Sequence, residues 1–243
     1  MSERRTRVTD IVLFTVLVYS ATVALQVYQP VTGGYFNLGE SMIYTAAIVS
    51  TPLVAGLAGG IGASLADLST GYAVFAPGTL IIKFVEGYAA GLLLRKLKGI
   101  HGVFKAVLTS SVYAFSFLLV STMLWSGGVY VGPSQWLLFT FTQPYVEVST
   151  AVWISIGVFI GGLALIALLK KYISSGEICS FAIAGLLMVL GYFLYEYYVS
   201  NPLQGREPLA AIAEIPVNFG QVIAGISIST PIIAWLRKAG FIK

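Results

Sequence analysis

Long apolar runs separated by short basic groups place the strongest limit on what this chain can fold into. Several of these runs reach about 20 residues, the length at which an α-helix crosses the hydrocarbon core of a bilayer. Charged residues make up only 10% of the 243 residues, whereas soluble domains carry about 25%. The chain therefore has too few charges to cover a water-facing surface. The sequence predicts an all-α integral membrane protein that forms a single polytopic helical bundle.

The apolar runs and the turn residues between them divide the chain into about eight membrane segments. We expect these segments at residues 8–28, 38–50, 53–72, 77–94, 103–125, 145–169, 178–199 and 209–236. The second and third segments are near the lower length limit for crossing and meet at Thr51 and Pro52. At least one of them is expected to reach only part-way or to tilt little. All segments belong to one transmembrane domain, residues 1–243.

The basic residues predict an orientation. With the N-terminus inside, twelve of the 14 Lys and Arg residues fall on the cytoplasmic side of this arrangement. These residues are Arg4, Arg5, Arg7, Arg95, Lys96, Lys98, Lys105, Lys170, Lys171, Arg237, Lys238 and Lys243. Arg206 is then outside, and Lys83 lies within a segment. Because membrane proteins keep Lys and Arg in their cytoplasmic loops, we expect both termini in the cytoplasm.

A small set of charged and amide residues falls inside the apolar segments. An ionised side chain at the middle of a bilayer costs about 3 kcal/mol or more, so such residues mark functional sites or structural pairs. The set consists of Glu40, Asp67, Lys83, Glu86, Glu147, Glu196 and Glu214, with Asn37, Asn218 and Gln221 as uncharged companions. Most of them fall in the outer half of the predicted bundle. A polar layer open to the outside is what a receptor for a polar solute requires.

Helical spacing groups these residues further. On each of three segments, polar residues lie three or four positions apart and therefore share one helix face. The groups are Thr79, Lys83 and Glu86; Tyr192 and Glu196; and Glu214, Asn218 and Gln221. The simplest packing turns the three polar faces toward one another.

A purely structural interpretation stays open for some of these residues. Lys83 could pair with Asp67 or Glu86 only to hold the bundle together, since buried pairs serve packing as well as function. Tyrosines at the outer ends of segments, such as Tyr72, are typical interfacial anchors. Tyr192 is the tyrosine that we most expect to contact a solute.

Small residues at every fourth position predict close helix contacts. Gly56, Gly60 and Ser64 have this spacing, which lets helix backbones approach closely in lipid. A similar patch on the first segment could dock a partner membrane subunit; it consists of Ser20, Ala21 and Ala24.

The glycine and polar residues also form a series of short motifs. The first half of the chain contains Gly34-Tyr35-Phe36-Asn37-Leu38-Gly39-Glu40, Gly59-Gly60-Ile61-Gly62 with Leu65-Ala66-Asp67 and Gly71-Tyr72, and Ala76-Pro77-Gly78-Thr79 with Lys83 and Glu86. The C-terminal part contains Gly191-Tyr192-Phe193-Leu194-Tyr195-Glu196, Ala213-Glu214-Ile215-Pro216-Val217-Asn218 and Gln221. In this order and spacing, the motifs resemble the substrate-binding S components of energy-coupling factor (ECF) transporters, in particular the riboflavin-transporter-like branch. The resemblance covers residues 8–98 and 177–238.

The resemblance implies a six-helix membrane protein that captures a vitamin or related micronutrient from outside, without enzymatic activity. Its implied partners are a transmembrane coupling subunit and two cytoplasmic ATPases. No cofactor is expected on this chain, and its lack of a GxxxxGK[ST] phosphate loop agrees with ATP being used by the partner ATPases. Family members close the first extracellular loop over the solute, which here corresponds to residues 30–40. Riboflavin is the default substrate by resemblance.

Two features depart from the family pattern. Residues 103–171 form an extra pair of segments that the six-helix pattern lacks, and we interpret them as an inserted hairpin. The alanine motif through which family members dock the coupling subunit is matched only approximately, at Ser20, Ala21 and Ala24.

Two other classes of function were weighed. A proton-coupled secondary transporter working alone could use Asp67, Lys83 and Glu86 as proton-linked groups. An intramembrane enzyme is disfavoured, because the sequence contains no plausible Ser/His pair, metal-ligand cluster or GxGD-like aspartyl motif.

Overall fold

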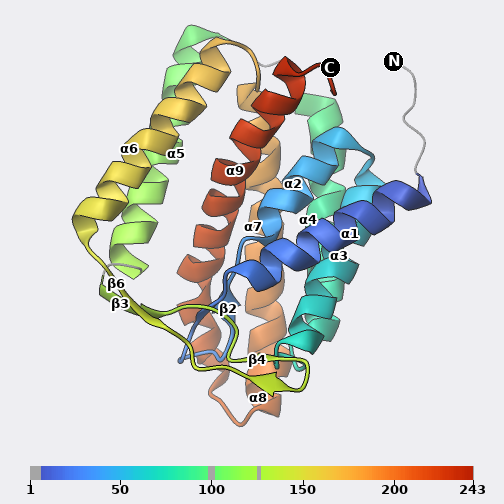
Figure 1. The fold of residues 1–243 in the computed structure, drawn as a ribbon, viewed down its shortest axis with the longest axis vertical. Helices are drawn as coiled ribbons and strands as arrows, with labels where there is room; N and C mark the ends of the chain where they lie inside the picture. Colours follow the sequence, from blue (N-terminus) through green and yellow to red (C-terminus); the bar gives the residue numbers. More distant parts are fainter. Residues whose placement is uncertain (1–6, 98–101, 125–126, 243) are drawn as a thin grey trace.

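The computed structural model describes residues 7–97, 102–124 and 127–242, which form a bundle of long helices with short strands at one end (Figure 1). The helices are α1 (Val8–Ala24), α2 (Gly39–Val49), α3 (Pro52–Ser69), α4 (Ala76–Leu97), α5 (Val103–Leu124), α6 (Thr150–Leu169), α7 (Ser175–Tyr195), α8 (Asn201–Leu203) and α9 (Glu214–Lys238). A π-helical turn, Glu196–Ser200, extends α7, and a 3-10 helix, Pro208–Ala213, leads into α9. The strands are β1 (Val27–Tyr28), β2 (Tyr35–Phe36), β3 (Gly127–Tyr130), β4 (Gln135–Trp136), β5 (Phe139–Thr140) and β6 (Tyr145–Val148).

Each predicted membrane segment coincides largely with one helix, of which α2, with 11 residues, is short. Within the described residues, five helical stretches are long and apolar enough to cross a membrane, among them α3, α4 and α6. Together with the family identified below, this makes the chain an all-α, multi-pass membrane protein. The number of crossings and the side on which the termini lie stay predictions.

The bundle has two distinct ends. The strands and α8 lie at the lower end of Figure 1, and α9 ends at the upper end. At that upper end, the hydroxyl of Ser50 donates to Asp10 (2.9 Å), and the guanidinium group of Arg237 forms an ion pair with Glu177 (2.6 Å). Of the basic residues used to predict the orientation, Arg4, Arg5, Lys98 and Lys243 lie outside the described residues.

The predicted close helix contact joins α3 to α4. A Cβ atom at Gly60 would overlap the backbone oxygen of Leu80, and one at Gly87 would overlap that of Ala55. Only glycine lets these two backbones approach so closely, which is how helices associate in lipid. The contact fixes the position of α4, and with it the position of Lys83.

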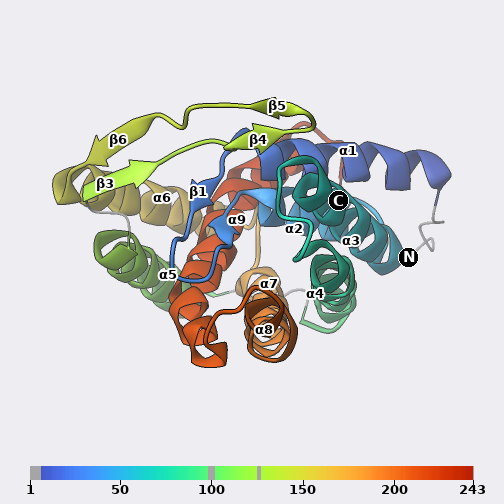
Figure 2. The same ribbon diagram turned by 90° about the horizontal axis from the view of Figure 1, so that it is seen from below.

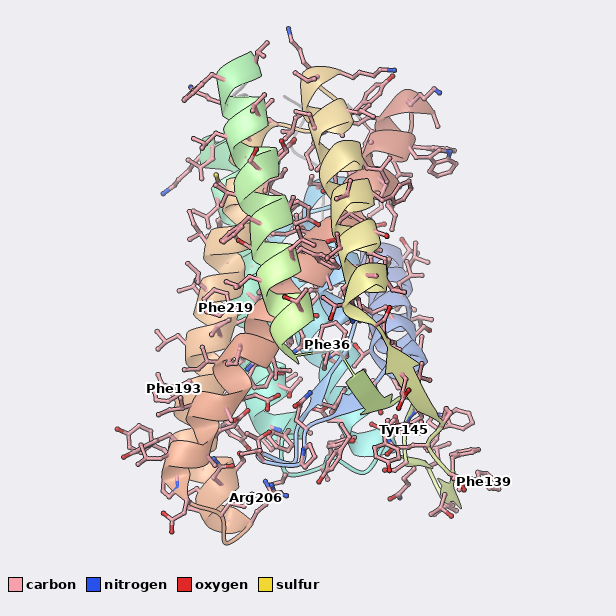
Figure 3. All side chains as sticks on the ribbon, turned by 90° about the vertical axis from the view of Figure 1, so that its left-hand side faces the viewer. Phe36, Phe139, Tyr145, Phe193, Arg206 and Phe219 are labelled. Carbon is pink, nitrogen blue, oxygen red and sulfur yellow. The ribbon has the colours of Figure 1, made fainter. Side chains whose placement is uncertain are left out.

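Helices α5 and α6 form a pair at one flank of the bundle, at the left of Figure 1. The pair packs on α9, where the hydroxyls of Tyr113 and Ser227 are hydrogen-bonded. Beyond the pair, the chain from β3 to β6 runs along one edge of the strand-bearing end as far as α1 and α3 (Figure 2). The amide of Leu137 donates there to the carbonyl of Ser69 (2.6 Å). Figure 3 shows Phe139 and Tyr145 on this stretch, at the lower end.

Two predicted segments are too long. Residues 145–148 form β6, which pairs with β3, so α6 begins at Thr150. Glu147 therefore lies on an exposed strand. The sequence had predicted it inside a membrane helix, and this prediction is wrong. Likewise α1 ends at Ala24, because the chain becomes extended and Val27–Tyr28 pairs with β2. In both places, apolar and β-branched residues suit a strand as well as a helix.

Candidate functional site

Polar side chains from six parts of the chain surround one small cavity near the strand-bearing end, called the polar cavity below. Its lining consists of Thr22, Gly34, Tyr35, Asn37, Ala63, Asp67, Phe75, Thr79, Lys83, Tyr192, Glu196, Glu214, Asn218 and Gln221. The cavity volume is about 30 Å³, which suffices for a couple of water molecules. The three polar helix faces predicted from spacing do meet here.

The helices present these residues for simple geometric reasons. Thr79 and Lys83 are one turn apart on α4, and Glu214, Asn218 and Gln221 follow one another along a single face of α9. Glu196 begins the π-helical turn after α7. Such wide turns frequently occur at functional sites.

Lys83 occupies the inner side of the cavity, between two buried carboxyl groups. Its ammonium group contacts Glu40 on α2 and Glu86 on α4, the latter at 3.3 Å. The hydroxyl of Tyr44 donates to the other oxygen of Glu86 (2.8 Å). The ammonium group also lies 5.5 Å from the ring centroid of Tyr192, within reach of a cation–π interaction. The structure therefore pairs Lys83 with Glu40 and Glu86, and not with Asp67.

Asp67 instead takes its hydrogen bond from an aromatic residue of the first outer loop. The hydroxyl of Tyr35 donates to Oδ1 of Asp67 (2.6 Å), and the ring of Tyr35 packs against Tyr72 at a centroid distance of 4.3 Å. Burial, and after it the carboxyl group of Asp67, raises the pKa of Tyr35 well above its ordinary value. The phenol thus keeps its proton at neutral pH and acts as a donor. On the other side, Tyr192 donates to the hydroxyl of Thr79 (3.0 Å).

A chain of amide groups joins α9 to the same loop. The amide nitrogen of Asn37 donates to Gln221 (2.5 Å), whose own amide nitrogen donates to Oδ1 of Asn218 (2.7 Å). Nearby, the hydroxyl of Thr32 donates to Glu214. These bonds tie the loop directly to polar residues of α9.

Several buried polar atoms around the cavity have no hydrogen-bond partner among the residues that the structure describes. They are Oδ2 of Asp67, Oε2 of Glu196 and Nδ2 of Asn218, together with Oε2 of Glu40 behind the lysine. Buried polar groups in proteins are nearly always hydrogen-bonded, so unpaired ones call for an explanation. A bound solute that supplies the missing partners is such an explanation.

The outer hairpin, defined here as residues 27–36 and named for the side of the membrane predicted for it, covers the cavity. Strands β1 and β2 pair in it, and its turn carries Gly33 in the left-handed region of backbone conformation (φ 73°). Arg206, from the loop after α8, donates to the carbonyls of Pro30 (3.0 Å) and Val31 (2.8 Å) and so holds the hairpin from below. Figure 3 shows Arg206 at the lower end of the bundle.

Most residues singled out in the sequence lie in or directly beside the cavity. Those that line it are Asn37, Asp67, Thr79, Lys83, Tyr192, Glu196, Glu214, Asn218 and Gln221. Glu40 and Glu86 lie behind Lys83, and Tyr72 lies behind Tyr35. Ser20, Ala21 and Ala24 lie elsewhere, on α1, where Ser20 and Ala24 are exposed.

Four residues in or beside the cavity were not predicted from the sequence: Thr22, Thr32, Tyr44 and Phe75. Tyr44 could have been found, because it lies one helical turn after Glu40 and therefore on the same face. Thr22 is one small hydroxyl in an apolar run, and nothing in its spacing distinguishes it. As for metals, in the part of the chain that the structure describes, no group of three or more His, Cys, Asp or Glu side chains could hold an ion.

A helical membrane protein with a covered polar cavity between its helices belongs to the class of membrane-embedded solute-binding proteins. Residues 5–171 match the family described as "ECF-type riboflavin transporter, S component". This match spans more than half of the chain, and the chain therefore belongs to that family, whose members are transporter subunits and not enzymes.

The other comparisons are narrower. The chain is 43% identical over 70 residues to an "Uncharacterized protein in gap 3'region" of Pyrococcus woesei. That alignment covers 29% of this chain and 47% of the relative, so the chain spans about half the length of the relative that it matches. No solved structure matches the chain.

Proposed function

We propose that this subunit captures a vitamin-like solute, with riboflavin as the first candidate, from outside the cell in the polar cavity, for import driven by ATP. One observation carries the proposal: polar residues from distant parts of the chain meet beneath a hairpin, and several of their buried atoms lack partners. Hydrocarbon does not tolerate such groups singly. A water-reachable binding site accounts for them.

In the same proposal, the chain crosses the membrane eight times with both termini in the cytoplasm. The basic residues at the ends of α4 and α9 and after α6 support this orientation. The outer hairpin and Arg206 then face outside, where the solute arrives.

Binding requires the cavity to open. Ligand pockets usually measure about 300–1,000 Å³, whereas this one holds about 30 Å³. The turn of the outer hairpin, residues 30–34, is the part that we expect to move, because hydrogen bonds to Arg206 and Glu214 hold it. The base of the hairpin is anchored by the buried Val27 and Phe36.

Energy for release into the cell is assigned to partners: a transmembrane coupling subunit and two cytoplasmic ATPases, as the S-component family implies in general. The docking face would include Ser20, Ala21 and Ala24 on α1. The small side chains support this assignment, with Ser20 and Ala24 exposed and Ala21 partly exposed. Co-purification with such partners, and its loss on Ala24→Trp, tests it.

A riboflavin titration, read by quenching of flavin fluorescence, tests the solute. The wild type should bind riboflavin at one site, and Asn218→Ala should weaken binding at least tenfold, because Asn218 lines the cavity with an unpaired amide nitrogen. The matched control is Thr230→Val on the same helix, about 18 Å further along, which also alters a buried unpaired polar atom. Equal loss in both variants, or no binding by the wild type, would refute riboflavin capture in the cavity.

A stand-alone proton-coupled transporter is the second candidate, favoured by the number of buried carboxyl groups around Lys83. The two proposals differ in vesicles that contain only this protein. Uptake driven by a pH gradient, without any ATPase, would favour the second candidate and contradict the first.

A further inference from the structure

The polar cavity has an excess of acidic groups. Asp67, Glu196 and Glu214 line it, and each is almost completely buried, with at most 3% of its surface exposed. Among the described lining residues, the basic side chain is Lys83, and it already contacts Glu40 and Glu86. Within the described lining, no positive charge is therefore left over to neutralise these three carboxyl groups.

These carboxyl groups are also short of hydrogen-bond donors. Tyr35 supplies one donor to Asp67, and Thr32 supplies one to Glu214. Oδ2 of Asp67 and Oε2 of Glu196 remain buried without a partner. Glu196 also lies close enough to Glu214 for the two carboxyl groups to interact electrostatically. Among the unpaired atoms of the described lining residues, Nδ2 of Asn218 is a donor, whereas those of Asp67 and Glu196 are carboxyl oxygens. These carboxyl groups thus need N–H, O–H or positive charge from a solute.

An anionic solute would be unfavourable here whether or not the carboxyl groups hold protons. Ionised carboxylates would repel it across a low-dielectric site. Protonated carboxyls would remove that repulsion, yet the anion would still be buried without a cation to pair with it, which is costly. A neutral or cationic solute rich in donors meets neither penalty.

We propose that the polar cavity selects its solute by charge: it accepts neutral or cationic molecules with several hydroxyl or N–H donors and rejects the phosphorylated or carboxylated forms of the same molecules. This inference rests on the proposed capture function and narrows its substrate class. Asp67, Glu196 and Glu214 act as specificity-determining residues.

Matched pairs of solutes test the inference. Riboflavin is compared with riboflavin 5′-phosphate, and cationic thiamine with thiamine monophosphate, by binding to the purified protein in detergent. For any parent that binds, the phosphorylated form should bind roughly 100-fold more weakly, since like charges facing each other in a binding site are strongly unfavourable. The double variant Glu196→Gln and Glu214→Gln should reduce this ratio at least tenfold.

A control variant separates the cavity from the general field of the protein. Glu147→Gln with Glu207→Gln removes the same number of charges from exposed positions at the strand-bearing end, and the ratio should stay unchanged. Raising the salt concentration should also leave it unchanged, because buried charges are screened far less than exposed ones.

The outcomes are distinct. A phosphorylated form that binds as tightly as its parent would overturn the charge selection but leave solute capture standing. A ratio that falls equally in the surface control would also overturn it, since the discrimination would then come from outside the cavity. Failure of every parent solute to bind would refute the capture function, and the inference with it.

Discussion

Lys83 offers the sharpest test of how the buried charges hold the bundle together. Its ammonium group lies between Glu40 on α2 and Glu86 on α4, and all three side chains are at most 2% exposed. Replacing Lys83 by Met keeps a long, flexible side chain of similar shape but removes the positive charge. Two buried carboxyl groups are then left without the positive charge between them.

The expected cost follows from that geometry. Removing one partner of a buried ion pair destabilises proteins by about 3–5 kcal/mol, because the remaining charge is left uncompensated. Proton uptake by one carboxyl group would reduce this cost, so we expect about 3 kcal/mol for Lys83→Met. Unfolding in mixtures of a mild and a denaturing detergent gives the free energy of unfolding of each protein. The difference between the wild type and Lys83→Met is the expected cost.

A second variant makes the explanation specific. Lys83→Met combined with Glu40→Gln removes more of the network, yet it should be more stable than Lys83→Met alone, because one uncompensated carboxyl group is gone. Lys105→Met, at an exposed position near the start of α5, is the matched control and should be nearly neutral. The reasoning is refuted if Lys83→Met is as stable as the wild type, or if the double variant is less stable than the single one.

Three further outcomes are expected. Arg206→Ala removes both hydrogen bonds to the outer hairpin and should speed solute release severalfold in a stopped-flow chase; an unchanged rate would mean that this arginine does not hold the cover closed. Gly60→Ala should destabilise the fold by about 1–3 kcal/mol in thermal unfolding, because the added Cβ would overlap the Leu80 carbonyl. The control Gly162→Ala, whose Cβ would meet no atom within 4 Å, should be neutral or slightly stabilising. Similar effects at both positions would contradict the close contact. Glu177→Gln removes the ion pair with Arg237 on α9. It should lower the unfolding temperature and leave the solute affinity intact. A loss of affinity without a loss of stability would contradict this structural role.

Much of the helical arrangement could be predicted, because lipid imposes simple rules on a sequence. Apolar runs give the positions of helices such as α3 and α9, and glycines such as Gly60 show where backbones meet. The same rules identified the cavity: an ionisable residue such as Lys83 or Glu214 is costly in hydrocarbon, so its presence in an apolar segment predicts a shared polar interior.

The partners of each polar residue could not be predicted in the same way. Helical spacing shows which residues share a face, but not which neighbouring helix that face meets. Lys83 was expected beside Asp67 or Glu86, and Glu40 from α2 was not anticipated as its partner. Glu147 was misplaced for a different reason, since the apolar residues around it suit a strand as well as a helix.

The central claim is that the polar cavity holds a small polar solute. Native mass spectrometry of the protein released from detergent, after purification from membranes of cells grown in rich medium, tests it most directly. We predict one organic molecule of low mass per chain, neutral or cationic, retained by the Thr230→Val control and lost in Asn218→Ala. A wild-type protein that is empty and stays empty when a panel of vitamins is added would contradict the claim.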